Sequence, residues 1–301
     1  MSAAFAPPER VGFVGLGNMG GPMALRLARA GFRVVVADAS RDAVTRLSAQ
    51  VACETPADLA ELGSCRVVIT MLPDGRAVRE VLLGARGIAT RLAPGSVLID
   101  MSSSSPVGTR QLGTDLTARG FSLVDAPVSG GVRKAVDGTL AIMAGGEMQV
   151  VERCRALLEP LGRVFPTGAT GSGHAMKALN NFLSAVNLAA AAEAVIAGER
   201  FGLNPANMIA ILNASTGKNS ATEQKYPAYV LPRNFASGFA LGLMAKDLRL
   251  ALEVSRAGGA AHSLLETCSG LYDAAEQQFG ARADNTEIVR FLESLTDGKH
   301  G

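Results

Sequence analysis

The chain has 301 residues, 48% of them hydrophobic, and its 29 Lys and Arg side chains nearly balance 27 Asp and Glu. This length and apolar content are enough for a large core and about two domains, which excludes a mainly disordered protein. A formal charge of +2, with no basic run interleaved with aromatic residues, argues against nucleic acid or a membrane surface as the partner.

The cysteines and the N-terminus indicate a cytoplasmic protein. Four cysteines lie far apart without a CxxC pair, so neither a metal site nor a disulfide framework is predicted. The N-terminal residues contain no basic segment followed by an apolar core, so no secretory signal is expected. The apolar run Leu179 to Ala197 is interrupted by Asn180, Asn181, Asn187 and Glu193, which makes it too polar for a predicted membrane span.

A glycine-rich turn follows the first predicted strand. The β-branched run Arg10 to Leu16 leads into Gly15-x-Gly17-x-x-Gly20, and Asn18 to Ala30 is typical of a helix. A strand, such a turn and a helix in this order form the dinucleotide-binding fingerprint. Gly15 permits the tight turn, Gly17 lets the backbone approach a pyrophosphate, and Gly20 lets helix and strand pack closely. The pyrophosphate would lie at the helix N-terminus.

An acidic residue ends the second predicted strand, Phe32 to Ala37. Asp38 stands about twenty residues after the glycines, where a carboxylate can accept hydrogen bonds from the adenosine ribose hydroxyls. The same carboxylate would repel a 2′-phosphate, so the sequence predicts NAD as cofactor in preference to NADP. Arg41, three residues further on, leaves NADP open as the alternative.

Three more strand-like runs follow, Val67 to Met71, Ser96 to Asp100 and Ser122 to Asp125. Helical stretches near 56–62, 75–83 and 106–118 separate them. This alternation predicts a parallel, doubly wound sheet with helices on both faces, and ligands of such sheets bind beyond the carboxyl ends of the strands. Leu72-Pro73 and the run Ser102 to Pro106 are therefore expected at the cofactor. The serine run by itself is also typical of a helix cap before Pro106.

The segment Asp125 to Gly131 again follows a strand. Ser129 offers a hydroxyl, and Gly130 and Gly131 expose backbone N–H groups in a turn that suits a carboxylate. An ordinary tight turn would have the same composition.

One long helix is predicted from Gly171-Ser172-Gly173 to the region of Gly198 to Gly202. Its polar side chains share a face about 80° wide. They are His174, Lys177, Asn181 and Ser184. Lys177 and Asn181 lie one turn apart and could hold the same small molecule, although a lysine that simply faces water is the common alternative. His174 is expected to cap or pack rather than to react.

After Gly168 the alternating pattern stops and helical periodicity continues to Leu295. We therefore predict a Rossmann-type α/β domain over 1–167 and an α-helical domain over 168–301, with the long helix between them and the reaction in the cleft they leave. Helices are expected at 205–213, 240–257 and 261–279. The loop Phe235 to Phe239 is expected by analogy to shape the substrate pocket, unless its aromatic rings only fill the core.

Four separated motifs resemble the β-hydroxyacid dehydrogenase family. They are Gly12-Phe13-Val14-Gly15-Leu16-Gly17-Asn18-Met19-Gly20; Asp125-Ala126-Pro127-Val128-Ser129-Gly130-Gly131 with Gly138-Thr139-Leu140; Gly171-x-Gly173-x-x-x-Lys177-x-x-Asn180-Asn181; and Lys246-Asp247-Leu248. They span nearly the whole chain and stand in the family's order.

The resemblance implies a role for each matching position. The first motif, Asn18 and Met19 included, is similar to the family's cofactor turn, and Leu72, Pro73 and Ser103 to its further cofactor contacts. Ser129, Gly130 and Gly131 correspond to the clamp for the substrate carboxylate. Lys177 matches the catalytic lysine, Asn181 the substrate-anchoring asparagine, and Lys246 a lysine near the nicotinamide, with Asp247 beside it.

The sequence departs from the family at two places. Ser103 stands where many relatives have threonine, which keeps the hydroxyl. Val132-Arg133-Lys134-Ala135 replaces small residues after the glycine pair, and its two cations either face water or indicate a more anionic substrate.

The implied reaction is hydride transfer between NAD and a small β-hydroxy acid of the 3-hydroxyisobutyrate type, or the matching semialdehyde. Lys177 would act as general base in oxidation and general acid in reduction, and no metal is needed. The alternatives are a dehydrogenase or reductase of tartronate semialdehyde, threonate or succinic semialdehyde, and an NAD-binding protein that has lost catalysis. A homodimer or homotetramer is expected from the Ala-rich helical domain and from family habit.

Overall fold

The computed structural model describes residues 3–297 and divides into two compact units between Lys177 and Ala178. The division falls inside helix α7 (Ser172–Arg200), because the first residues of α7 pack with the sheet of the first unit. Gly168, where the alternating sequence pattern stops, is the last residue of the last strand.

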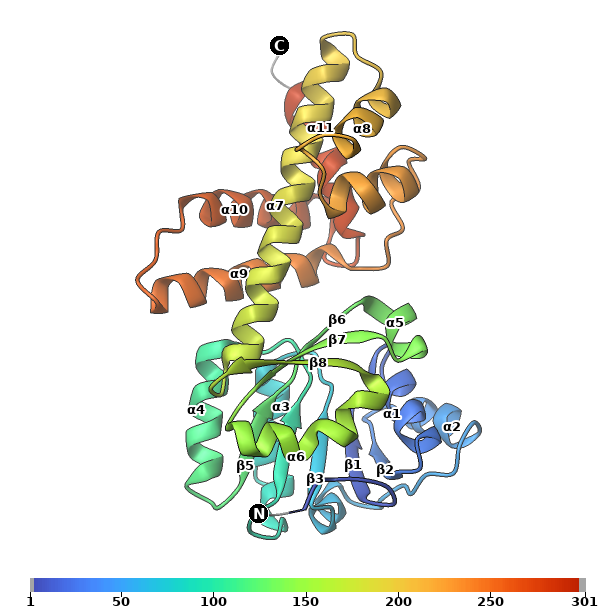
Figure 1. Ribbon diagram of the computed structural model, residues 1–301, viewed down its shortest axis with the longest axis vertical. Helices are drawn as coiled ribbons and strands as arrows, with labels where there is room; N and C mark the ends of the chain where they lie inside the picture. Colours follow the sequence, from blue (N-terminus) through green and yellow to red (C-terminus); the bar gives the residue numbers. More distant parts are fainter. Residues whose placement is uncertain (1–2, 298–301) are drawn as a thin grey trace. The chain divides into compact units, whose positions relative to one another are not determined.

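Within the described residues the first unit contains an eight-stranded sheet (Figure 1). Its strands are β1 (Arg10–Val14), β2 (Arg33–Ala37), β3 (Val67–Thr70), β4 (Val97–Asp100), β5 (Ser122–Asp125), β6 (Val128–Ser129), β7 (Leu140–Gly145) and β8 (Gly162–Gly168). The spatial order is β2-β1-β3-β4-β5-β7-β6, and β8 pairs with β7.

The sheet is parallel from β2 to β5, as predicted, and mixed beyond β5. Strand β7 runs antiparallel to both β5 and β6 and parallel to β8. The sequence pattern does not predict this mixed part, because β6 has only two residues and β7 is a short apolar run without clear alternation.

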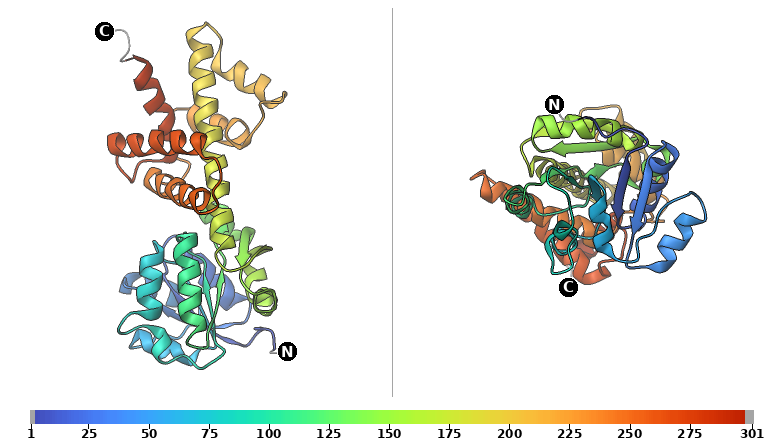
Figure 2. Two further views of the ribbon diagram at one scale, coloured as in Figure 1. Left: turned by 90° about the vertical axis from the view of Figure 1, so that its left-hand side faces the viewer. Right: turned by 90° about the horizontal axis from the view of Figure 1, so that it is seen from below.

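Helices lie on both faces of the sheet (Figure 2). They are α1 (Gly20–Arg29), α2 (Arg41–Ser48), α3 (Gly75–Leu83), α4 (Pro106–Thr117), α5 (Gly131–Asp137) and α6 (Met148–Leu158), with short 3₁₀ turns η1 (Leu59–Ser64), η2 (Ile88–Thr90) and η3 (Glu159–Leu161). Helix α2 was not predicted, and the stretch expected as a helix near 56–62 overlaps the 3₁₀ turn η1, which runs from Leu59 to Ser64.

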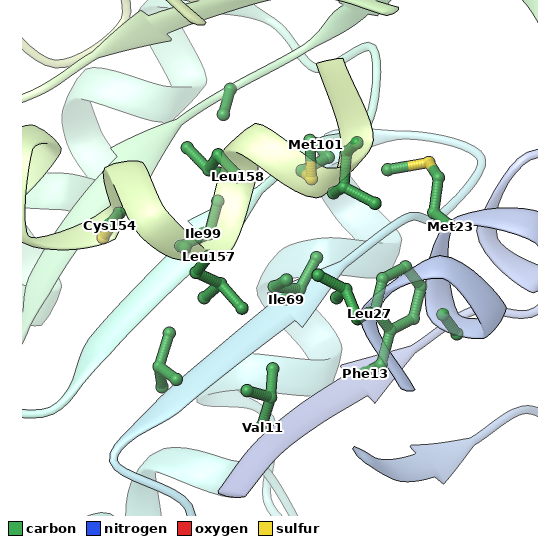
Figure 3. Close-up of a cluster of buried hydrophobic side chains, with 14 of the residues drawn as sticks. Val11, Phe13, Met23, Leu27, Ile69, Ile99, Met101, Cys154, Leu157 and Leu158 are labelled. Carbon is green, nitrogen blue, oxygen red and sulfur yellow. The ribbon is translucent and has the colours of Figure 1, made fainter. Parts of the chain in front are cut away.

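The strands bury alternate residues on opposite faces. Val67 and Ile69 belong to a core shared with α1 and α6, whereas Val68 belongs to a second core shared with α3 and α4. Figure 3 shows the first core, in which side chains of β1 and β3 meet Met23 and Leu27 of α1. Burial on both faces explains why these strands consist of nearly unbroken apolar runs.

The second unit is helical. It contains most of α7, followed by α8 (Pro205–Asn213), the π-helix η4 (Ala221–Val230), α9 (Leu241–Ala257), α10 (Ser263–Phe279), the 3₁₀ turn η5 (Asn285–Glu287) and α11 (Ile288–Asp297). The predicted helices 205–213, 240–257 and 261–279 agree with α8, α9 and α10 to within two residues. Helix η4 was missed, since Pro227 stands inside it.

By length and composition alone α7 qualifies as a candidate membrane span, contrary to the expectation that its run is too polar. In the structure it is the central helix of the second unit. Its residues from Ala178 to Val195 contribute to a core shared with α8, η4, α9, α10 and α11.

Candidate active site

The glycine turn between β1 and α1 has the steric requirements of a dinucleotide site. Gly15 has φ +98°, and a Cβ there would lie 2.2 Å from the carbonyl oxygen of Met71. A Cβ on Gly20 would lie 1.9 Å from the carbonyl oxygen of Gly15. Gly17 and Asn18 are exposed and Met19 precedes the first turn of α1. Only glycine fits at 15 and 20, and the turn presents backbone N–H groups at the start of α1.

Asp38 lies directly after β2 and faces this turn. Its Oδ2 accepts a hydrogen bond from the Leu16 N–H at 2.6 Å, and its Oδ1 accepts one from the Ser40 N–H at 2.7 Å. These bonds fix the carboxylate beside the glycine turn, and each oxygen has a further lone pair for a ribose hydroxyl. Arg41 is exposed at the start of α2. The turn and Asp38 together fit an adenosine dinucleotide.

The loops after β3 and β4 are bonded to each other. The Leu72 N–H donates to Ser102 Oγ at 2.9 Å, and within the loop after β4 Ser104 Oγ donates to Asp100 Oδ2 at 2.7 Å. Ser105 caps α4, because its Oγ accepts a hydrogen bond from the Gly108 N–H. The alternative that the serine run caps a helix is therefore confirmed for Ser105. Half-buried Ser103 and exposed Pro73 lie in the same two loops, at the carboxyl ends of the strands.

The turn after β6 consists of two left-handed glycines. Gly130 has φ +136° and Gly131 has φ +68°, and both are exposed beside half-buried Ser129. Arg133 is exposed and lies 3.9 Å from Asp137 in an ion pair. Lys134 is also exposed, but its stem lies along Gly130, where an added Cβ would be 2.5 Å from Lys134 Cδ. The ion pair supports a solvent-facing charge for Arg133, whereas Lys134 lies beside the turn expected to bind the substrate carboxylate.

The start of α7 is anchored to the end of β5. Asp125 accepts the Gly171 N–H at 2.7 Å and the His174 N–H at 2.9 Å. A Cβ on Gly173 would lie 2.3 Å from the Met143 carbonyl oxygen, which explains the glycines of this motif. Burial raises the pKa of Asp125, while His174 and the two N–H groups act in the opposite direction. Helix α7 therefore begins at the carboxyl edge of the sheet.

His174 joins α7 to the cofactor loop, a connection the sequence analysis did not find. The buried ring lies with Nε2 3.0 Å from the Ser102 carbonyl oxygen and Nδ1 2.9 Å from Thr109 Oγ1. Because a carbonyl only accepts, Nε2 carries a proton and donates to Ser102. The carboxylates of Asp100 and Asp125 each lie 3.7 Å from a ring nitrogen. The packing role expected for His174 thus extends to holding the loop that contains Ser103.

Lys177 lies on α7 one turn after His174 and is half-buried. Asn181 follows one turn later in the second unit and is 6% exposed. Its Nδ2 donates to Asp247 Oδ2 at 2.6 Å, and its Oδ1 accepts from Asn180 Nδ2 at 3.1 Å. Asp247 is part of the Lys246-Asp247-Leu248 motif on α9, so two motifs 66 residues apart in sequence meet here. Lys246 beside it is half-buried.

Ser184, the last member of the polar face, is contacted by a lysine that the sequence did not single out. Lys225 Nζ, from η4, lies 3.2 Å from Ser184 Oγ and 3.3 Å from Asn285 Oδ1. Burial lowers the pKa of Lys225 to about 8, and the charge of Asp284 partly counteracts this effect. No local pattern distinguishes Lys225 from a surface lysine.

The aromatic loop Phe235 to Phe239 follows η4. Arg233 and Arg290 lie over the Phe235 ring at 4.9 and 5.8 Å, and both Phe235 and Phe239 pack against the core of the second unit. These contacts favour the interpretation that the aromatic rings of the loop pack within the second unit.

Comparison with known proteins gives two matching families. Residues 10–186 match the NAD binding domain of 6-phosphogluconate dehydrogenase, and residues 171–292 match the family described as NAD-binding of NADP-dependent 3-hydroxyisobutyrate dehydrogenase. The chain is 34% identical to 2-(hydroxymethyl)glutarate dehydrogenase of Eubacterium barkeri, over 95% of this chain and 96% of the relative. It is 40% identical to 3-hydroxyisobutyrate dehydrogenase of Pseudomonas aeruginosa, over 82% and 85%.

A solved structure of 3-hydroxyisobutyrate dehydrogenase from Mycobacterium tuberculosis with L-serine aligns with a TM-score of 0.87 and 32% identity, covering 94% of this chain and 99% of that one. These matches extend over both units and include all four motifs. The chain therefore belongs to the β-hydroxyacid dehydrogenase family of NAD-dependent oxidoreductases.

Proposed function

We propose that this protein oxidises a small β-hydroxy acid of the 3-hydroxyisobutyrate type to the matching semialdehyde, or reduces the semialdehyde. The observation that carries the proposal is the anchoring of α7. Its first turn is bonded through Asp125 and His174 to the ends of β4 and β5, where a parallel sheet binds its ligand. Lys177 follows on the next turn.

NAD is the cofactor that fits the first unit. The turn containing Gly15, Gly17, Asn18, Met19 and Gly20 would receive the pyrophosphate, and Asp38 the adenosine ribose. We assign the remaining contacts to Leu72, Pro73 and Ser103 in the loops after β3 and β4, and to Lys246. When bound, NAD supplies a hydride acceptor at C4 of the nicotinamide ring.

The chain's own residues handle the substrate and its proton. Ser129 and the N–H groups of Gly130 and Gly131 would bind the carboxylate, and Asn181 would orient the molecule. Lys177 would bond to the hydroxyl group, accept its proton in oxidation and return it in reduction. Placing this amine on a helix rather than on a loop limits the positions it can adopt.

A substrate panel tests the proposal. Purified protein is assayed for NADH formation at alkaline pH with 3-hydroxyisobutyrate, L-serine, glycerate, threonate and 4-hydroxybutyrate, and for NADH consumption with tartronate and succinic semialdehydes. The proposal predicts the highest kcat/KM for 3-hydroxyisobutyrate. Binding of NADH without turnover of any member would instead support the non-catalytic alternative. A maximum for threonate, for glycerate and tartronate semialdehyde, or for 4-hydroxybutyrate and succinic semialdehyde would favour one of the other family reactions.

We further propose that the protein is a cytoplasmic homodimer or homotetramer. In support, the second unit exposes large apolar side chains on α7, next to α7 and on α8, namely Leu183 at 56%, Phe201 at 87% and Ile211 at 65%. A second copy that covered them would remove this area from water. Light scattering should give the mass of two or four chains, and a monomer at micromolar concentration would contradict the proposal.

A further inference from the structure

The stem of Lys134 lies on the glycine turn that follows β6. A Cβ added to Gly130 would be 2.5 Å from Lys134 Cδ, 2.8 Å from its Cβ and 3.0 Å from its Cγ. The stem therefore occupies the side of Gly130 on which any other residue would carry its side chain. Because Nζ is only two bonds beyond Cδ, the ammonium lies within roughly 6 to 7 Å of the Gly130 Cα.

The geometry of α5 directs Lys134 toward this turn. The helix begins at Gly131, so Lys134 lies one helical turn after Gly130. Helical side chains lean toward the N-terminus, over the residues three and four positions earlier. Arg133 is rotated from Lys134 by about 100° around the helix axis, and it forms its ion pair with Asp137. Of these two neighbouring cations, Lys134 is the one that lies over the turn.

Helix α5 is fixed to the rest of the first unit (Figure 1). Ala135, next to Lys134, is fully buried in the core shared with α1. Arg26 of α1 donates from Nη1 to the Val136 carbonyl oxygen at 3.0 Å. The Lys134 carbonyl oxygen accepts the Thr139 N–H at 3.0 Å, which closes the end of the helix. The backbone that carries the ammonium is thus in place before any ligand binds.

The turn beside Lys134 offers uncharged donors and open space. Ser129 is half-buried and is held by its pairing with Ala141 of β7. A Cβ added to Gly131 would meet no atom within 4 Å, so a ligand can approach the backbone there. Among residues 3–297, Lys134 has no ion pair of its own. A hydroxyl and backbone N–H groups bind the oxygen of a neutral amide as well as that of an acid, whereas a cation favours the acid.

We propose that Lys134 supplies the positive charge that pairs with the substrate carboxylate on the turn from Ser129 to Gly131. Lys134 is then a residue that determines specificity, because it makes the site select acids over uncharged analogues of the same shape. This inference rests on the proposed function, which assigns the carboxylate to this turn. It gives a role to the cation that replaces a small residue of the family in the segment after the glycine pair.

The variant Lys134→Gln removes the charge and keeps a long polar side chain. Arg133→Gln is the matched control, since it removes one positive charge from the neighbouring residue. At low ionic strength Lys134→Gln should raise KM for 3-hydroxyisobutyrate about five- to tenfold and leave kcat within twofold, because the interaction is the same in the ground state and the transition state. Lys134→Arg and Arg133→Gln should both stay within twofold of wild type in KM. An unchanged KM in Lys134→Gln, or an equal increase in both glutamine variants, would overturn the proposal.

Binding of unreactive analogues gives a readout that does not depend on turnover. With NADH present, titrations followed by NADH fluorescence should show isobutyrate binding to wild type at least tenfold more tightly than isobutyramide. Lys134→Gln should lower this ratio at least fivefold. Raising NaCl from about 20 mM to about 500 mM should weaken isobutyrate binding to wild type severalfold more than binding to Lys134→Gln, because salt screens an exposed charge pair. A loss of packing alone would not remove this salt dependence.

The two experiments separate this proposal from the proposed function. If the binding pattern holds while no substrate is oxidised, the role of Lys134 stands and the proposed function fails. If 3-hydroxyisobutyrate is oxidised with the same KM by wild type and Lys134→Gln, the proposed function stands and the role of Lys134 is refuted. Equal affinity of wild type for isobutyrate and isobutyramide refutes that role without any variant.

Discussion

Replacing Lys225 by glutamine should change the pH dependence of stability in a way that only a buried ammonium explains. Burial lowers the pKa of Lys225 from 10.5 to about 8, which corresponds to about 3 kcal/mol of folding free energy. The sign of the effect on folding stability follows from the lowered pKa of Lys225. Below pH 8 the lysine is charged in both the folded and unfolded states, so the folded protein carries the whole cost.

Between pH 8 and 10.5 the folded protein releases this proton and the unfolded chain keeps it, so wild-type stability rises with pH. The Gln variant lacks this contribution. The difference in unfolding free energy, variant minus wild type, should therefore be about 2 kcal/mol more positive at pH 7 than at pH 9.5. Urea unfolding of both proteins at the two pH values measures the difference. Lys218→Gln is the control, since Lys218 is in the same unit and pairs with Glu223 at the surface. A stability difference that is the same at both pH values would refute the burial argument.

Three further changes test the first unit. Wild type should prefer NAD over NADP by at least tenfold in kcat/KM. Asp38→Ser should lower this ratio because it removes the carboxylate after β2. A wild-type preference for NADP would contradict the assignment of NAD as cofactor. Gly20→Ala places a Cβ 1.9 Å from the Gly15 carbonyl and should abolish NADH binding measured by fluorescence, whereas unchanged affinity would show that the turn relaxes. His174→Ala leaves the Ser102 carbonyl and Thr109 hydroxyl without their partner, so it should lower the free energy of unfolding by about 2–4 kcal/mol and raise KM for NAD; an unaltered KM would separate His174 from the cofactor loop.

The sequence predicts those parts of the fold whose causes are local. The turn from Gly15 to Gly20 requires glycine at both ends, because a Cβ at either position would clash with a backbone carbonyl oxygen. The spacing of these glycines can be recognised in the sequence. The strands β3 and β4 are apolar on both faces, and α7 has helix formers between two groups of glycines. Each of these elements is determined by residues next to one another in the chain.

What could not be predicted depends on partners distant in sequence. Lys225 and Ser184 are 41 residues apart, and His174 lies 72 residues from the Ser102 carbonyl that it holds. Nothing near Lys225 distinguishes it from a surface lysine, and Pro227 inside η4 hides the helix that carries it. The antiparallel pairing of β7 was likewise missed, because it depends on long-range contacts and not on the residues of β7.

The proposed reaction depends most on Lys177, the residue that would handle the substrate proton. Lys177→Ala should lower kcat by about a hundredfold or more with the best substrate of the panel. NADH affinity, measured by fluorescence, should stay within a few-fold of wild type, and Lys218→Ala should leave both quantities unchanged. A Lys177→Ala enzyme that retains kcat within a few-fold of wild type would contradict the proposed mechanism.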